Sequence, residues 1–155
     1  MSIIEFKSKA KAECMAYYKE FKNKREDYES KYFQDVSAFL QFARVKTLTN
    51  ITRSELCALI GTYEGNFSNF INSKNRKNKI PYNYAFWIVL STASSYDQAL
   101  VLMAKSGNIM DDSNEPFCLS RALFLTLCGE ENYKIRLDIA KEIIAETPYY
   151  DFFTH

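Results

Sequence analysis

Apolar residues recur along this chain three and four positions apart, and charged or amide side chains fill the positions between them. That spacing places the apolar residues on one face of an α-helix. Only four glycines and three prolines interrupt the pattern, so the chain has few sharp turns. The sequence therefore predicts an all-α fold, a compact bundle of about seven helices in a single domain.

The N-terminal segment, residues 1–33, is predicted to be one amphipathic helix. Its lysines and glutamates lie between the members of an apolar seam, which are Cys14, Tyr18, Phe21, Tyr28 and Tyr32. A helix with one ring-rich stripe needs a surface to pack on. Packing against the rest of the chain is the preferred interpretation, and a basic arm or a dimerisation element is the alternative.

The most clearly signalled helix occupies residues 53–60. Thr52 and Glu55 match the T-x-x-E capping box, and the apolar Ile51 precedes the cap. Gly61 is suited to the left-handed conformation that often ends a helix. We therefore expect a helix whose two ends are both defined by the sequence.

Further helices lie on either side of that segment. Asp35 can cap a helix before it, whose apolar stripe fades at residues 46–50. Another helix is expected after it, over residues 64–72. The apolar residues of this helix are Phe67, Phe70 and Ile71. Because the connection between the two helices is so short, they must meet at a sharp angle.

The remaining helices are predicted to complete the core. Pro81 opens a helix that is apolar nearly all round, so we expect it at the centre. Its aromatic residues have helical spacing, which favours core packing over a base-stacking platform; they are Tyr82, Tyr84, Phe86 and Trp87. Ser94 or Ser95 can cap the next helix, which ends at Gly107. The last two helices are predicted over residues 116–127 and 133–146.

The net charge of +1 hides an uneven distribution along the chain. Residues 36–96 hold seven basic and two acidic side chains, a net charge of +5. Residues 97–155 hold five basic and ten acidic ones, a net charge of −5. This asymmetry indicates an anion-binding middle segment and a C-terminal third that avoids the same anion. The alternative is chance segregation of charges on solvated faces.

The residue inventory argues against a metal site, a cofactor and catalysis. His155 is the only histidine, and the four cysteines include no CxxC pair. The cysteines are Cys14, Cys57, Cys118 and Cys128. The acidic pairs at 111–112 and 130–131 have no histidine beside them, and no phosphate-binding glycine motif occurs. We expect a protein that is not an enzyme and holds no cofactor, with buried free thiols.

Membrane and export signals are also missing from the sequence. No apolar run approaches the roughly 20 residues that cross a bilayer. The opening segment MSIIEFKSKAKAE has no apolar signal-peptide region before its charges begin. We therefore expect a cytoplasmic protein with no membrane partner.

Residues 36–93 resemble a helix-turn-helix domain of the lambda-repressor-like (Cro-type) superfamily. The matching features are a capped helix start, a small residue expected at the close contact between the two helices, a glycine turn, three apolar anchors and a polar exit. They are Thr52 to Leu56, Ala58, Gly61, Phe67, Phe70, Ile71 and Asn72. The resemblance divides the chain into an N-terminal amphipathic helix (1–33), a helix-turn-helix domain (34–93) and a C-terminal helical extension packed on it (94–155).

In that superfamily the second motif helix enters the major groove, while the start of the first helix and the loop after the second contact phosphates. The resemblance therefore implies base-edge contacts by Glu64, Gly65, Asn66, Ser68 and Asn69. It implies phosphate contacts by Thr52, Arg53, Lys74, Arg76, Lys77 and Lys79. An asparagine amide can pair with an adenine edge, which discriminates between bases by about 1–3 kcal/mol. The basic side chains would add affinity by releasing counterions.

Each of these features also has a plainer explanation. The basic run SKNRKNK, residues 73–79, is either a phosphate-binding loop or a solvated turn. Asn66 and Asn69 are either base-reading residues or ordinary surface residues. Glu64 can accept only from cytosine in the groove and is repelled by phosphates, and Gly65 offers no side chain to a base. These two residues keep a protein-binding role open.

The sequence thus supports two interpretations. The first is a sequence-specific DNA-binding transcriptional regulator, a repressor of a bacterium or its mobile element, which binds double-stranded DNA as a homodimer on paired half-sites. The second is a protein-binding module on the same scaffold, an antirepressor or an inhibitor of a host defence or regulatory protein. In that case the acidic C-terminal third would contact a basic partner.

Overall fold

Helices make up the regular secondary structure of the described part of this chain. The structure, a computed structural model, describes residues 2–24, 33–73, 78–108 and 114–154, and these hold nine α-helices and no β-strand. The helices are α1 (Ile3–Lys24), α2 (Val36–Asn50), α3 (Arg53–Ile60), α4 (Glu64–Ile71), α5 (Tyr82–Thr92), α6 (Tyr96–Lys105), α7 (Glu115–Leu127), α8 (Tyr133–Ala145) and α9 (Tyr150–Thr154). The prediction of an all-α fold is confirmed, whereas the predicted count of about seven helices is wrong.

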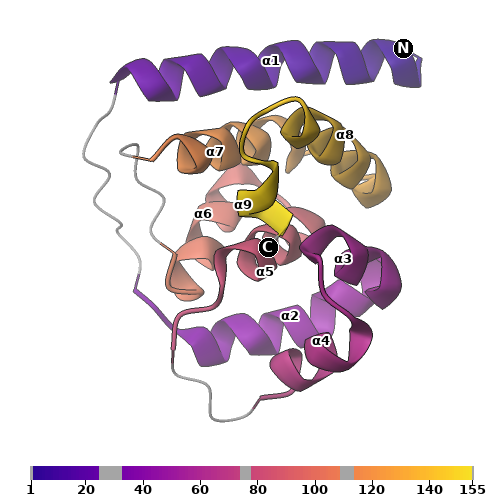
Figure 1. Cartoon of the computed structure of the whole chain (residues 1–155), viewed down its shortest axis with the longest axis vertical. Coiled ribbons are helices and arrows are strands. Elements are labelled where there is room, and N and C mark those ends of the chain that lie inside the picture. Colours follow the sequence, from indigo (N-terminus) through magenta and orange to yellow (C-terminus); the bar gives the residue numbers. More distant parts are fainter. Residues whose placement is uncertain (1, 25–32, 74–77, 109–113, 155) are drawn as a thin grey trace.

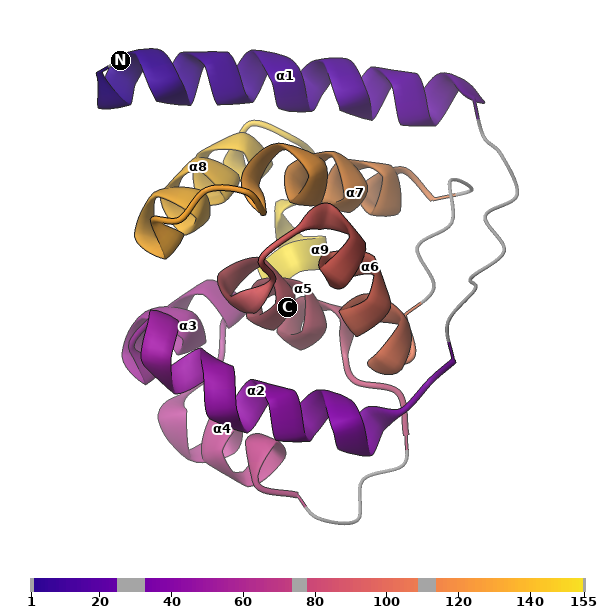
Figure 2. The same ribbon diagram turned by 180° about the vertical axis from the view of Figure 1, so that it is seen from behind.

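The helices surround α5, which lies near the middle of the bundle (Figure 1). In both views α1 lies along one end of the molecule, and α2 and α4 lie at the opposite end (Figures 1 and 2). α7 and α8 form a layer beneath α1 and contact it. α3 contacts α4, α5 and α9. The two helices expected to bind DNA are therefore remote from α1.

The helix α5 is the core of the fold, as its all-round apolar sequence predicted. Every residue from 85 to 92 is buried, and the helix contacts α2, α3, α6, α7, α8 and α9. The rings of Phe86 and Trp87 pack edge to face with their centroids 4.9 Å apart, which is a favoured aromatic arrangement. Their exposed fractions are 0% and 1%, so their assignment to the core is confirmed.

Side-chain caps confirm three of the predicted helix starts. Asp35 Oδ1 and Thr52 Oγ1 each accept a hydrogen bond at 3.1 Å from the backbone N–H three residues later. Ser95, of the two serines considered for α6, caps that helix in the same way at 3.1 Å. These local signals fix where α2, α3 and α6 begin.

Two helices differ from the sequence-based expectation. α2 ends at Asn50, so it includes residues 46–50, where its apolar stripe was expected to fade. The N–H of Ile51 donates to Thr47 O at 3.4 Å. α9 was not predicted, because five residues are too few to show a helical period. It is held in place by Phe153, which is fully buried and whose carbonyl oxygen accepts a hydrogen bond from Trp87 Nε1 at 2.8 Å.

The seam predicted for α1 packs against α7 and α8. Cys14 and Tyr18 are buried and Phe21 is half-buried. Tyr28 and Tyr32 lie outside the described residues. The described part of the seam therefore supports the packing interpretation of this helix.

Ion pairs also join α1 to α8. Lys7 Nζ lies 3.3 Å from Glu142 Oε1, and Lys11 Nζ lies 3.2 Å from Glu142 Oε2 and 3.3 Å from Glu146 Oε1. The hydrogen bonds with Glu142 and Glu146 raise the pKa of Lys11, and those with Lys11 and Lys7 lower the pKa of Glu142. Part of the negative charge of the C-terminal third is thus neutralised within the chain.

One arginine is buried in the core. Arg136 of α8 is only 2% exposed, and its guanidinium donates hydrogen bonds to the carbonyl oxygens of Leu90, Ala93, Cys128 and Glu130. The first three of these residues lie at the C-terminal ends of α5 and α7. Helix C-termini carry unpaired carbonyls and a partial negative charge, both of which stabilise a cation. Arg136 therefore holds α8 against two other helix ends.

All four cysteines are free and buried, as predicted. Burial raises the pKa of Cys14 to about 12 and that of Cys128 to about 12. The thiolate is the reactive form of cysteine. These two thiols are therefore expected to stay protonated and unreactive in the folded chain.

Replacing Arg136 with methionine should lower the free energy of unfolding by about 3–5 kcal/mol, because buried carbonyl oxygens lose their donor. Urea unfolding followed by circular dichroism measures this loss. Lys134→Met, at an exposed position of the same helix, is the control and should change the free energy by less than about 0.5 kcal/mol. Equal effects of the two substitutions would contradict the role given to Arg136.

The buried thiols predict a loss of stability at alkaline pH. An unfolded thiol ionises at about pH 8.5, whereas Cys14 and Cys128 keep their protons in the folded chain up to about pH 12. The unfolded state therefore binds fewer protons in this range, and each thiol lowers the free energy of unfolding by about 1.4 kcal/mol per pH unit as the pH rises.

The variant Cys14→Ala/Cys128→Ala should accordingly have a slope that is shallower than the wild-type slope by about 2.7 kcal/mol per pH unit. Urea unfolding at a series of pH values measures both slopes. Since only the slopes are compared, the cost of removing two buried side chains does not affect the result. Identical slopes would show that the thiols do not contribute.

Candidate nucleic-acid interface

The turn between α3 and α4 has the conformation that its glycine predicts. Gly61 has φ 84° and ψ 32°, in the left-handed region, and the N–H groups of Gly61 and Thr62 donate to one carbonyl oxygen of α3, both at 3.0 Å. Asn83 Nδ2 of α5 donates to Ile60 O at 3.2 Å. Tyr84 OH of α5 donates to Thr62 Oγ1 at 3.0 Å. The core helix therefore fixes the turn.

The helix α4 has a buried side and an exposed side. Its buried residues are Phe67, Phe70 and Ile71, as predicted. Of the residues implied to read bases, Ser68 is half-buried and the exposed ones are Glu64, Gly65, Asn66 and Asn69. α4 lies on the outside of the bundle at the end opposite α1 (Figures 1 and 2). Its polar side is therefore open to a macromolecular partner.

Two of the predicted site residues contact each other. Arg53 Nη1 donates to Ser68 Oγ at 2.7 Å, and the guanidinium carbon lies 6.0 Å from the centre of the Phe67 ring. Arg53 thus connects the start of α3 to the middle of α4. A guanidinium has five N–H donors, so this bond leaves others that could reach a phosphate.

The hydroxyl of Thr52, another predicted phosphate contact, already has two hydrogen bonds. It accepts from Glu55 N at 3.1 Å and donates to Glu55 Oε1 at 3.0 Å. These bonds cap α3. A phosphate contact by this hydroxyl would therefore require the cap to rearrange.

Tyr63 is an exposed aromatic residue beside the predicted site, and it was not among the residues predicted for that site. It directly precedes α4 and is 68% exposed. A Cβ atom at Gly65 would lie 3.4 Å from Tyr63 Cε2, which is an ordinary contact, so space does not require glycine there. In the sequence, Tyr63 stands out because it is an aromatic residue that lies outside the apolar period of α4.

The described residues of α3 and α4 are not positively charged overall, since Arg53 is accompanied by Glu55 and Glu64. The basic run after α4 is expected to supply further positive charge. Lys79 of that run is exposed. Lys74, Arg76 and Lys77 lie outside the described residues. A shared surface of the basic run and α4 therefore stays a prediction.

The C-terminal end of α6 holds the chain directly after the basic run. Ile80 N donates to Ser106 O at 2.8 Å, and Asn108 Nδ2 donates to Ile80 O at 3.0 Å. Gly107 has φ 91°, and a Cβ atom there would lie 3.0 Å from Lys79 Cβ and 3.1 Å from its Cα. Glycine therefore allows the two segments to lie in contact, and the end of the basic run has a fixed position.

Ala58 does not occupy the close contact between α3 and α4, so that prediction is wrong. Ala58 is exposed, whereas Cys57 is buried with an exposed fraction of 3%. Successive residues of a helix differ by about 100° in direction. An error of one position therefore moves a residue from the inner side of α3 toward solvent.

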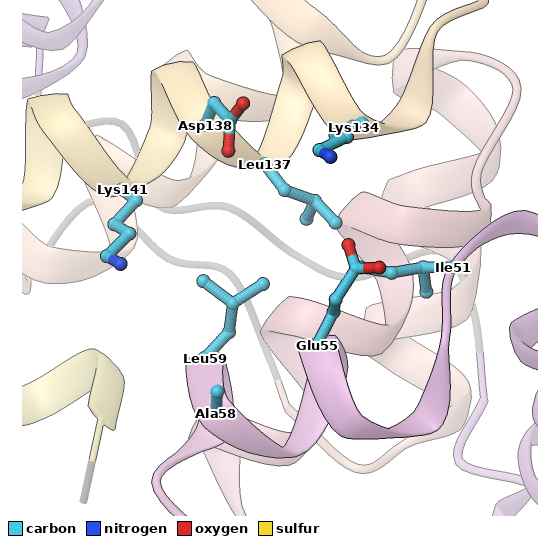
Figure 3. A pocket seen from close by; sticks show the side chains of 8 residues that line it. All are labelled: Ile51, Glu55, Ala58, Leu59, Lys134, Leu137, Asp138 and Lys141. Atoms are coloured by element: carbon cyan, nitrogen blue, oxygen red, sulfur yellow. The ribbon is translucent and has the colours of Figure 1, made fainter.

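A groove lies between α3 and α8 (Figure 3). It has a volume of about 210 Å³ and is lined by Ile51, Glu55, Ala58, Leu59, Lys134, Leu137, Asp138 and Lys141. A smaller cavity of about 70 Å³ shares Ala58, Leu59 and Lys141 with it. The other residues of the smaller cavity are Trp87, Ile144, Tyr150 and Thr154. The sequence does not predict a site here, because the groove is formed by segments far apart in the chain.

Within residues 2–24, 33–73, 78–108 and 114–154, no group of three or more histidine, cysteine, aspartate or glutamate side chains could hold a metal ion. In the same residues, no helix has both the length and the apolar character needed to span a membrane. No protein-family model, curated protein or solved structure matches this chain.

Proposed function

We propose that this chain is a DNA-binding transcriptional regulator, in which the exposed side of α4 enters the major groove. The observation that carries the proposal is the arrangement of α3 and α4. They are short helices joined by a left-handed glycine turn, and the polar side of the second helix faces outward at one end of the bundle. This arrangement resembles a helix-turn-helix that presents its second helix to DNA.

Asn66 and Asn69 are the residues of α4 best suited to base contacts. They lie three positions apart, so they share one side of the helix, and both are exposed. Each amide can pair with an adenine edge in the major groove. Glu64 is also exposed, at the first position of α4, and would accept a hydrogen bond from cytosine N4.

Affinity for DNA would come mainly from phosphate contacts. Arg53 is held at the start of α3 by its bond to Ser68, so its guanidinium has a defined position. Lys79 is held beside the end of α6, and the other basic residues of the run directly precede it in the chain. Each phosphate that such residues neutralise releases counterions from the DNA. A repressor that acts as a homodimer on paired half-sites fits this mode of binding.

A protein-binding module is the second candidate, and the groove between α3 and α8 favours it. The groove is lined in part by Ala58 and Leu59 of α3, and none of its lining residues belongs to α4. The acidic C-terminal third is a weaker argument for a basic partner, because Glu142 and Glu146 already pair with lysines of α1.

A titration with random-sequence duplex DNA tests the DNA-binding proposal. The wild type should bind at low salt, and fluorescence anisotropy at several salt concentrations gives the slope of log K against log salt. The variant Lys74→Ala/Arg76→Ala/Lys77→Ala/Lys79→Ala should reduce the magnitude of that slope by about 3–4, because each lost phosphate contact removes about 0.9.

The control is Lys9→Ala/Lys19→Ala, which removes two exposed lysines from α1 at the other end of the molecule. Its slope should equal that of the wild type. Circular dichroism establishes that each variant is folded. An absence of binding by the wild type at low salt, or an unchanged slope in the variant of the basic run, would contradict the proposal.

A further inference from the structure

We propose that the groove between α3 and α8 binds a helix of a partner protein. Apolar side chains of that helix would cover Ala58 and Leu59, and its acidic side chains would pair with Lys134 and Lys141. The proposal does not depend on DNA binding by α4, because it rests on a different surface. It assigns the chain a second macromolecular partner.

The groove is about two helical turns long. The smaller cavity shares Ala58, Leu59 and Lys141 with it, but Trp87 and Ile144, which line only that cavity, are each 1% exposed. The exposed lining residues of α8 extend from Lys134 to Lys141, a rise of about 10 Å at about 1.5 Å per residue. About two turns of a second helix would cover this length.

The floor of the groove suits close helix packing. Ala58 is a small exposed residue of α3, and the larger Leu59 beside it is half-buried. Leu137 of α8, which is 3% exposed, lies across from them, and Tyr150, which is 45% exposed, lines the smaller cavity at α9. A small residue between larger apolar ones lets a ridge of side chains on another helix enter the groove. An amphipathic helix laid in an apolar groove is a common mode of peptide recognition.

Ion pairing differs between the two sides of α8. On the α1 side of α8, two glutamates pair with lysines at 3.2–3.3 Å. On the groove side, Lys134, Asp138 and Lys141 make no ion pair with any described residue. The same helix thus has one neutralised side and one side whose charges border the exposed Ala58 and the half-buried Leu59.

The order of those charges specifies the partner. Lys134 and Lys141 lie seven residues, about two turns, apart on the α8 wall, and Asp138 lies between them (Figure 3). A helix along this wall complements them with two acidic residues seven positions apart and a basic residue between. Glu55 stands on the opposite wall, where it repels an acidic side chain placed next to α3. The acidic side chains must therefore face α8.

Two synthetic helical peptides test the proposal in the absence of DNA, by fluorescence anisotropy with the full chain. Both carry leucines three and four positions apart on one face. The first has two glutamates seven positions apart beside the leucines and a lysine between them, and the second has these three charges reversed. The first peptide should bind the wild type at least about tenfold more tightly than the second, because its charges complement those of α8.

Three variants test how peptide binding depends on the charges of α8, on the shape of the groove and on charge changes elsewhere in the chain. Lys134→Glu/Asp138→Lys/Lys141→Glu should invert the preference between the peptides. Ala58→Arg, which fills the middle of the groove from an exposed position, should weaken binding of the first peptide at least about tenfold. Lys9→Glu/Lys19→Glu on α1 is the control and should leave the preference unchanged.

Circular dichroism establishes that each variant is folded before the affinities are compared. Failure of both peptides to bind the wild type would overturn the proposal, as would equal affinities for the two. A preference that survives the charge reversal on α8 would also overturn it. Because no DNA is present, any of these results leaves the proposed DNA-binding function untouched.

Discussion

Burial of α5 on every side is the constraint on which the other parts of this structure depend. A helix with no polar side must be covered all round, and six helices cover α5 here. The same helix also acts on the surface, because Asn83 and Tyr84 hydrogen-bond the turn between α3 and α4. The direction in which α4 presents its polar residues is therefore determined by the core.

The position of α8 follows from the same core through Arg136. Its guanidinium binds carbonyl oxygens at the ends of α5 and α7, so α8 cannot shift without leaving buried acceptors unpaired. α8 forms one wall of the groove, and α3, which also packs on α5, forms the other. Both walls of the groove therefore pack on α5, and the turn before α4 is hydrogen-bonded to the same helix. α3 contributes to both, with Arg53 beside α4 and Leu59 in the groove.

Local signals in the sequence predicted much of this fold. Caps, a turn glycine and apolar periodicity act within a few residues, which is why the starts of α2, α3 and α6 and the end of α3 could be located. Arg136 could not be identified as a core residue, because its acceptors lie up to 46 positions away along the chain. The groove was missed for the same reason, since it exists only where distant segments meet, whereas α9 was missed because five residues are too few to show a helical period. Within the candidate site, the exposure of Asn66 and Asn69 followed from periodicity, but the bond between Arg53 and Ser68 required the actual angle between two helices.

The central claim is that the polar side of α4 is a DNA-binding surface. Backbone amide chemical shifts of the labelled chain, recorded while duplex DNA is added at low salt, test it most directly. We expect the largest shift changes at Gly65, Asn66, Asn69 and Lys79 and none along α1. Shift changes that leave α4 unaffected, or that gather at Leu59 and Leu137 in the groove, would contradict it.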